Sequence, residues 1–118
     1  MKALKEAEEY DGPSIVIAYS PCINHGINMS MSQKEEKKAV DAGYWLLYRY
    51  DPRREELGEN PFIFESPEPK IDVAEFLNGE KRYSSLQTTF PENSARFVEQ
   101  FKGYVIKRYN KFKKMAEK

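Results

Sequence analysis

The residues of this chain best suited to metal binding or nucleophilic chemistry are its single cysteine and its single histidine, Cys22 and His25. They lie three positions apart, between Pro21 and Gly26. Three roles are open to such a thiol: a small buried apolar side chain, a thiolate nucleophile with His25 as its base, or one ligand of a metal centre completed by cysteines from elsewhere. Pro21 stiffens the approach to the thiol, and Gly26 lets the backbone turn closely, as a loop around an inorganic cluster requires. These residues alone leave all three roles open.

The spacing and number of the two residues limit each chemical role. In cysteine-dependent enzymes the thiol and the imidazole usually come from distant parts of the chain, so a separation of three positions is unusual. One cysteine and one histidine are also too few for a complete metal site. A metal role for Cys22 would therefore need ligands from other polypeptide. A single cysteine excludes an internal disulfide and is typical of a reducing compartment.

The element expected to position Cys22 is a short apolar run, Ile15 to Tyr19, which is rich in β-branched residues. Gly12-Pro13 precedes this run and Ser20-Pro21 follows it, so it is too short for a helix. The pattern predicts a buried strand. Cys22 then follows the carboxyl end of that strand, which is where open α/β sheets place their ligands.

The rest of the chain alternates helical and β-prone segments. We expect a short helix over 2–10 and a charged surface helix over 32–42, with a capping box at Ser32 and Glu35 and with Gly43 as its left-handed end. The runs 44–50 and 61–65 predict a hairpin-like strand pair.

The carboxyl-terminal part is expected to be helical. Asp72 should cap a short helix over 73–77, and 83–87 should add another turn or two. A long helix is expected from about Pro91, with one apolar face formed at helical spacing by Phe97, Phe101, Tyr104, Val105, Phe112 and Met115.

Charge and hydropathy narrow the class of protein. Lysine plus arginine equals aspartate plus glutamate, 19 of each, so no net charge favours nucleic acid or a membrane surface. No apolar run approaches the roughly 18–20 residues that span a bilayer, and the first nine residues do not have the pattern of a signal peptide. We expect a soluble, cytoplasmic domain with no nucleic-acid or membrane partner. Acids dominate 51–80 and bases dominate 95–118. Such blocks usually mark solvated faces, and the functional alternative is docking of the basic final helix against an acidic surface, within the protein or on a partner.

Four blocks of sequence identify a family. They are DGPSIVIAYSPCINHGI at 11–27, AVDAGYWLLYRYDP at 39–52, NPFIF at 60–64 and FLNGEKRY at 76–83. Through these blocks the chain resembles the carboxyl-terminal region of pyruvate:ferredoxin (flavodoxin) oxidoreductases, over essentially its whole length. Enzymes of this family are large and cytoplasmic. They decarboxylate pyruvate on thiamine diphosphate, pass the electrons through iron–sulfur clusters to ferredoxin or flavodoxin, and release acetyl-CoA.

The resemblance implies a site and a fold. By this similarity Cys22 is one of four cysteine ligands of the [4Fe–4S] cluster nearest the thiamine, and Asn24 and His25 only support the loop. Residues 1–118 are then a single, partial carboxyl-terminal domain of a larger oxidoreductase. The expected fold is an α/β fragment of a thiamine-diphosphate-binding domain, with one buried strand, a surface helix, a hairpin-like strand pair and a carboxyl-terminal helical region.

The sequence also departs from the family pattern. It lacks the other three cysteine ligands, the Gly-Asp-Gly segment that holds magnesium and diphosphate, and the pyruvate and coenzyme A regions. We therefore expect the isolated chain to be inactive and not to bind thiamine diphosphate or magnesium alone. Its expected partners are the remainder of the parent enzyme and, for that enzyme, ferredoxin or flavodoxin. An unfinished sheet edge would also invite self-association.

Two other functions remain open from the sequence. One is a small cysteine hydrolase or transferase that uses Cys22 and His25. The other is a non-catalytic interaction module that docks through its basic final helix.

Overall fold

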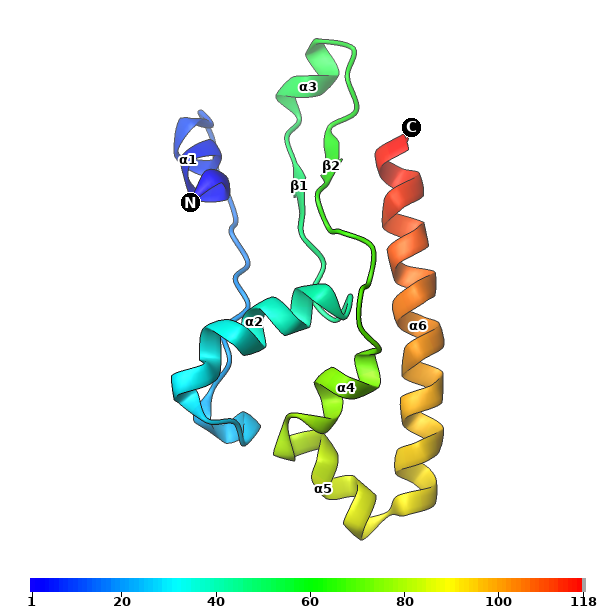
Figure 1. The fold of residues 1–118 in the computed structure, drawn as a ribbon. Coiled ribbons are helices and arrows are strands. Elements are labelled where there is room, and N and C mark those ends of the chain that lie inside the picture. Colours follow the sequence, from blue (N-terminus) through cyan, green and yellow to red (C-terminus); the bar gives the residue numbers. More distant parts are fainter. Residues whose placement is uncertain (118) are drawn as a thin grey trace.

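A computed structural model describes residues 1–117 as a set of helices around one small sheet (Figure 1). The first half contains α1 (Lys2–Glu9), the 3-10 turns η1 (Ile23–His25) and η2 (Met29–Met31), α2 (Ser32–Asp41), β1 (Tyr48–Tyr50) and α3 (Arg53–Glu56). The second half contains β2 (Phe62–Phe64), α4 (Val73–Asn78), α5 (Lys81–Thr89) and α6 (Pro91–Glu117). The α/β class and the order of helices expected from the sequence are confirmed. None of the helices within 1–117 is long and apolar enough to cross a membrane.

The apolar core lies where α2, α4 and α6 meet. It is built from Ala39, Ala42, Val73, Phe76, Leu77 and Val105, and all six are buried. Phe76 is the largest apolar side chain that is fully buried. Helix α4 begins where expected, because the Asp72 side chain accepts a hydrogen bond of 2.8 Å from the backbone N–H of Ala74.

Helix α6 joins the helical core to the hairpin (Figure 1). The middle of α6 contributes Val105 to the core, with Phe101 packed against it. Further along, Tyr109 packs on Phe64 of β2, with ring centroids 5.3 Å apart, and Phe112 packs on the hairpin aromatics. The expected apolar face is thus partly right. Tyr109 belongs to it, whereas three residues placed there remain 40–52% exposed: Phe97, Tyr104 and Met115.

The expected buried strand at Ile15 to Tyr19 is wrong. This segment has no strand pairing in the structure, and Ile15 and Ile17 are 89% and 71% exposed. A buried strand needs neighbours at its edges and on its faces, and within 1–117 the sheet contains β1 and β2 alone. Only Tyr19, at the end of the run, packs against the core. Cys22 therefore follows an irregular segment.

The hairpin is confirmed in a shorter form. Strands β1 and β2 pair antiparallel, with Tyr48 opposite Phe64 and Tyr50 opposite Phe62. Residues 44–47, expected to start the first strand, instead connect α2 to the hairpin, and the backbone N–H of Trp45 donates to the Ala39 carbonyl oxygen. The charged loop after β1 contains the short helix α3.

The start of α2 differs from the prediction, and its end agrees with it. The expected capping box is wrong because Ser32 is already the first residue of the helix and Met31 precedes it without a side-chain cap. Glu35 therefore turns toward α4 instead of back to Ser32, since its Oε1 lies near Gly79. Gly43 has a φ of +68°, the left-handed conformation expected at this helix end.

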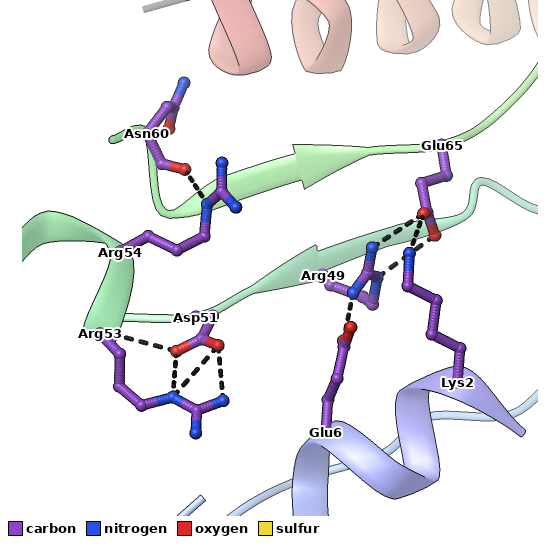
Figure 2. Close-up of polar contacts among 8 residues, drawn as sticks. All are labelled: Lys2, Glu6, Arg49, Asp51, Arg53, Arg54, Asn60 and Glu65. Atoms are coloured by element: carbon purple, nitrogen blue, oxygen red, sulfur yellow. Dashed lines mark hydrogen bonds and ion pairs between the residues drawn. The ribbon is translucent and has the colours of Figure 1, made fainter. Parts of the chain in front are cut away.

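Helix α1 sits beside the hairpin and is held by charges (Figure 2). None of its residues is buried. Glu6 accepts a hydrogen bond from Arg49 of β1, while Arg49 Nη2 donates to Glu65 Oε1 at 2.8 Å and Lys2 Nζ donates to the same oxygen at 3.1 Å. Ion pairs of this kind stabilise weakly and are screened by salt. We call these four residues the arm cluster, because they attach the amino-terminal arm, residues 1–17, to the hairpin.

The overall shape is elongated. The principal extents are 53 × 30 × 22 Å, and the radius of gyration is 17.0 Å. A compact domain of this length would have a radius of gyration of about 13–14 Å. Much of the apolar surface, including Ile15, Ile17 and Ile23, is correspondingly exposed.

Candidate functional site

Cys22 is exposed and begins the 3-10 turn η1. The backbone N–H of His25 donates to the Cys22 carbonyl oxygen at 2.9 Å, and the backbone N–H of Cys22 donates to Nδ1 of His25 at 3.4 Å. Gly26 closes the turn by donating to the Ile23 carbonyl oxygen at 3.0 Å. The thiol therefore projects from a short hydrogen-bonded turn, and the role of Cys22 as a buried apolar side chain is excluded.

The Cys22 loop, residues 19–26, packs closely on the start of α5. Gly26 has a φ of +72°, and a Cβ added to it would lie 2.3 Å from Cβ of Lys81. Real Cβ contacts do not become this short, so the backbone approach requires glycine here. The expectation that Gly26 lets the loop turn closely is confirmed, and the surface that it approaches is now identified.

A buried carboxylate, Glu80, lies beneath the loop. It is 0% exposed and immediately precedes α5. Its Oε2 accepts from Nε of Arg82 at 2.5 Å, and its Oε1 accepts from the Tyr19 hydroxyl at 3.3 Å. The same Oε1 lies 3.9 Å from Nδ1 of His25. Burial first, and the Glu80 charge second, raise the pKa of the Tyr19 hydroxyl, so Tyr19 remains a donor.

Two further groups surround Glu80. The Tyr44 and Tyr83 hydroxyls are 2.7 Å apart, and Nη2 of Arg82 donates to the Tyr44 hydroxyl at 3.4 Å. Glu35 has a buried Oε1 with no hydrogen-bond partner. Burial and then the charge of Glu80 raise the pKa of the Glu35 carboxyl. We call Tyr19, Glu35, Tyr44, Glu80, Arg82 and Tyr83 the Glu80 network.

Sequence reasoning found the exposed part of this site and missed the buried part. It singled out Cys22, Asn24 and His25, which the structure places on one turn. It gave no role to Glu80, which meets the Cys22 loop through Tyr19 and His25, both far away in the sequence. The available signal was an acid directly after the helix-ending Asn78-Gly79, between the buried Leu77 and the start of α5.

The donor set fits one ligand of an iron–sulfur cluster and not a whole metal site. Among residues 1–117, no group of three or more His, Cys, Asp or Glu side chains is placed to hold a metal ion. Cysteine thiolate is nevertheless the usual ligand of such clusters, and the Cys22 thiol is accessible. Any cluster bound here would take its other ligands from other polypeptide.

The geometry also bears on the two other functions. Nδ1 of His25 accepts from the backbone N–H of Cys22, so this nitrogen is not free to act as a base toward the thiol.

The basic helix α6 forms ion pairs with acids of the same chain. Lys102 pairs with Asp72 at 3.0 Å, and Lys113 pairs with Glu68 at 3.6 Å. The expected docking of the basic helix on an acidic surface is thus met inside the protein.

A groove separates the amino-terminal arm from the hairpin. Its volume is about 770 Å³, and its walls include Ile15 and Ile17 on one side and Trp45 and Leu47 on the other. Ile15, Ile17 and Leu47 are all at least 40% exposed. The arm cluster bridges this groove.

Comparisons with known proteins relate the chain to a group of large enzymes. No family model matches the chain. It is 53% identical over 117 residues to the pyruvate:ferredoxin oxidoreductase of Moorella thermoacetica, covering 99% of this chain and 10% of that protein. It is 47% identical over 118 residues to the pyruvate-flavodoxin oxidoreductase of Enterobacter agglomerans, covering 98% of this chain and 10% of that protein.

A third relative carries a different name. The mitochondrial NADP(+) pyruvate dehydrogenase of Euglena gracilis is 38% identical over 119 residues, covering 99% of this chain and 7% of that protein. The chain thus spans about a tenth or less of the length of these relatives. These matches confirm the resemblance drawn from the sequence: over its whole length, the chain is a relative of one segment of the pyruvate:ferredoxin and pyruvate-flavodoxin oxidoreductases.

Proposed function

We propose that this chain acts as the carboxyl-terminal segment of a pyruvate:ferredoxin/flavodoxin-type oxidoreductase and supplies one ligand, Cys22, to a [4Fe–4S] cluster. The other three thiolates would come from polypeptide outside residues 1–118. In this assembly the segment completes a thiamine-diphosphate-binding domain, and the isolated chain neither turns over pyruvate nor binds thiamine diphosphate and magnesium by itself.

One observation carries this proposal. The chain is 53% identical to a pyruvate:ferredoxin oxidoreductase and has one thiol, Cys22. This thiol is exposed on a turn that is held by hydrogen bonds in both directions between Cys22 and His25. The elongated shape and the exposed Ile15 and Ile17 support it further, since such apolar surface is expected to be covered by more protein.

The residues around Cys22 have defined tasks in this function. A bound cluster accepts and passes on single electrons. Gly26 keeps the turn against Lys81, and the backbone hydrogen bonds of η1 fix the direction of the Cys22 side chain. Asn24 and His25 support the turn and do not act as ligands. The potential of the cluster would be set by thiolate ligation, by hydrogen bonds and by burial.

The parent enzyme would oxidise pyruvate and release acetyl-CoA, with ferredoxin or flavodoxin as electron acceptor. The names of the three relatives differ in their acceptor, which is ferredoxin, flavodoxin or NADP(+), whereas all three name pyruvate. We therefore assign this segment to the steps that precede electron transfer to the acceptor. We place the parent enzyme in the cytoplasm, as the resemblance implies.

The test is the change of Cys22→Ala in the full-length oxidoreductase that carries this segment. We expect loss of one [4Fe–4S] signal in the electron paramagnetic resonance spectrum of the reduced enzyme and loss of acceptor reduction by pyruvate. Asn110→Ala, an exposed position of α6 outside the Cys22 loop, is the control and should keep the cluster. Undiminished cluster content in Cys22→Ala would refute the ligand role.

A further inference from the structure

Glu80 is a buried charge whose position the helix does not explain. It is the residue immediately before α5, a position where shorter side chains such as Asp or Ser accept hydrogen bonds from the backbone of the first turn. Its side chain makes no such bond. Burying a carboxylate is costly unless the charge is paired and hydrogen-bonded, and Glu80 is fully buried. Its location must therefore be set by the groups that its two oxygens face.

Those groups lie on both sides of Cys22. Tyr19, three positions before the thiol, donates its hydroxyl to Oε1 of Glu80 at 3.3 Å. His25, three positions after it, places Nδ1 at 3.9 Å from the same oxygen, and this nitrogen accepts the backbone N–H of Cys22. Arg82 donates to Oε2 and balances the charge. One carboxylate oxygen thus faces both ends of the Cys22 loop.

We propose that Glu80 is a positioning residue for Cys22. Its carboxylate holds the Tyr19 end of the loop by accepting the Tyr19 hydroxyl, and the backbone hydrogen bonds of η1 hold the other end, so that the thiol projects in one direction. The consequence for a cluster rests on the function proposed above. The anchoring of the loop is a property of this chain alone and is tested without a cluster. A merely structural alternative exists, because the Glu80–Arg82 pair could serve only to close the turn between α4 and α5.

The first experiment measures amide hydrogen exchange in the 118-residue chain. In Glu80→Ala we expect the Cys22, His25 and Gly26 amides to exchange at least about tenfold faster, as for loss of a hydrogen bond to a charged group. Glu75→Ala is the control, because Glu75 lies on α4 and is exposed. In Glu75→Ala the amides of the Cys22 loop should exchange as fast as in the unchanged chain.

A second variant keeps this test decisive if Glu80→Ala does not fold. Tyr19→Phe retains the ring packed on Trp45 and removes only the hydroxyl that Glu80 accepts. We expect it to accelerate exchange of the same loop amides while α6 keeps its protection. Unchanged loop exchange in folded Tyr19→Phe, and in Glu80→Ala where it folds, would overturn the anchoring.

The second experiment uses the full-length oxidoreductase and Glu80→Gln, which keeps an acceptor for Tyr19 and removes the charge. We expect full cluster content, a more positive reduction potential and altered g-values in the spectrum of the reduced cluster. If Cys22→Ala loses the cluster but Glu80→Gln leaves its potential and spectrum unchanged, the role of Glu80 toward the cluster is overturned and the proposed function stands. If Cys22→Ala keeps the cluster, the proposed function fails, and the exchange data alone decide whether Glu80 anchors the loop.

Discussion

The guanidinium of Arg108 in α6 donates a hydrogen bond of 2.9 Å to the carbonyl oxygen of Gly43, the residue that ends α2. The same nitrogen donates to the Tyr44 carbonyl oxygen at 2.6 Å. The two bonds hold the long helix against the point where the chain leaves α2 for the hairpin. Gly43 is therefore constrained both by its own conformation and by the helix packed on it.

This constraint predicts a large cost for Gly43→Ala. The φ of +68° disfavours a Cβ, and the added atom would lie 2.9 Å from Cγ1 of Val105 and 3.0 Å from Cγ of Pro69. Strain and overpacking together should lower the free energy of unfolding by about 2–4 kcal/mol. Gly58→Ala is the matched control, because Gly58 has a φ of +72° with no atom within 4 Å, and should cost about 1–2 kcal/mol. Urea denaturation of both variants measures the difference, and equal costs would show that α6 does not press on Gly43.

Glu35→Gln is expected to stabilise the chain at neutral pH. Burial, and then the charge of Glu80, raise the folded-state pKa of Glu35. The contribution of this carboxyl to the free energy of unfolding is therefore fully present below its ordinary pKa and is lost as the pH rises through the raised value. Glutamine carries no charge, so the repulsion from Glu80 and the cost of burying a charge are both removed. Because the Glu35 side chain is partly exposed and screened by solvent, we expect a gain of only about 0.5–1 kcal/mol at pH 7.

The pH dependence separates this effect from a general change in helix stability. Thermal unfolding of Glu35→Gln and of the unchanged chain should agree near pH 4 and diverge as the pH rises to 7. Glu36→Gln, the next carboxylate of the same helix, controls for loss of an acid near the start of α2. A stability difference that is the same at both pH values would contradict the raised pKa.

Local signals in the sequence correctly predicted the start of α4 and the end of α2, whereas the strand prediction failed because a strand depends on long-range pairing. Asp72 caps α4 and Gly43 ends α2 because each of these effects involves residues within one turn. The run Ile15 to Tyr19 has the composition of a strand, but a strand exists only where another strand pairs with it, and composition does not report that. Segments of the sequence that match a family nevertheless predicted the correct relatives.

The buried part of the site could not be predicted from the sequence for a related reason. Glu80 meets Tyr19 and His25, which lie more than fifty positions earlier in the chain. No periodicity or spacing connects residues this far apart. Glu35 shows the opposite error. Its spacing from Ser32 matches a capping box, but Ser32 is the first residue of the helix and not its cap. Glu35 belongs to the Glu80 network instead.

Exposure of Cys22 predicts its reactivity in the folded chain. Because the thiol is accessible, alkylation by iodoacetamide at pH 8 should proceed within about tenfold of the rate in urea, where access is complete. The chain has one cysteine, so mass spectrometry counts a single adduct, and Cys22→Ser serves as the blank. A rate more than a hundredfold slower in the folded chain would mean that the thiol is covered, which would contradict both the structure and the ligand role.

Arg49→Met is expected to release the amino-terminal arm. Helix α1 buries no residue, so its attachment depends on polar contacts. Arg49 pairs with Glu6 of α1 and also holds Glu65, which pairs with Lys2 of α1 (Figure 2). Outside the arm cluster, Nη1 of Arg53 donates to the Glu9 carbonyl oxygen at 3.3 Å. An isolated helix of this length is marginal in water, so without Arg49 the amides of α1 should exchange about tenfold faster or more. Raising the ionic strength to 1 M, where the screening length falls to about 3 Å, should act on the unchanged chain in the same direction.

A second arginine of the same hairpin supplies the control for that measurement. The Arg54 side chain bonds only within the hairpin. It donates to the Asn60 carbonyl oxygen at 2.8 Å (Figure 2) and pairs with Glu59 at 3.0 Å. Arg54→Met should therefore leave α1 exchange unchanged while removing the same charge. If α1 keeps its protection in Arg49→Met at both low and high salt, contacts other than the arm cluster hold it. The arm would then be joined to the hairpin by apolar packing across the groove, and deletion of the Ile15 and Ile17 side chains, not of Arg49, would release it.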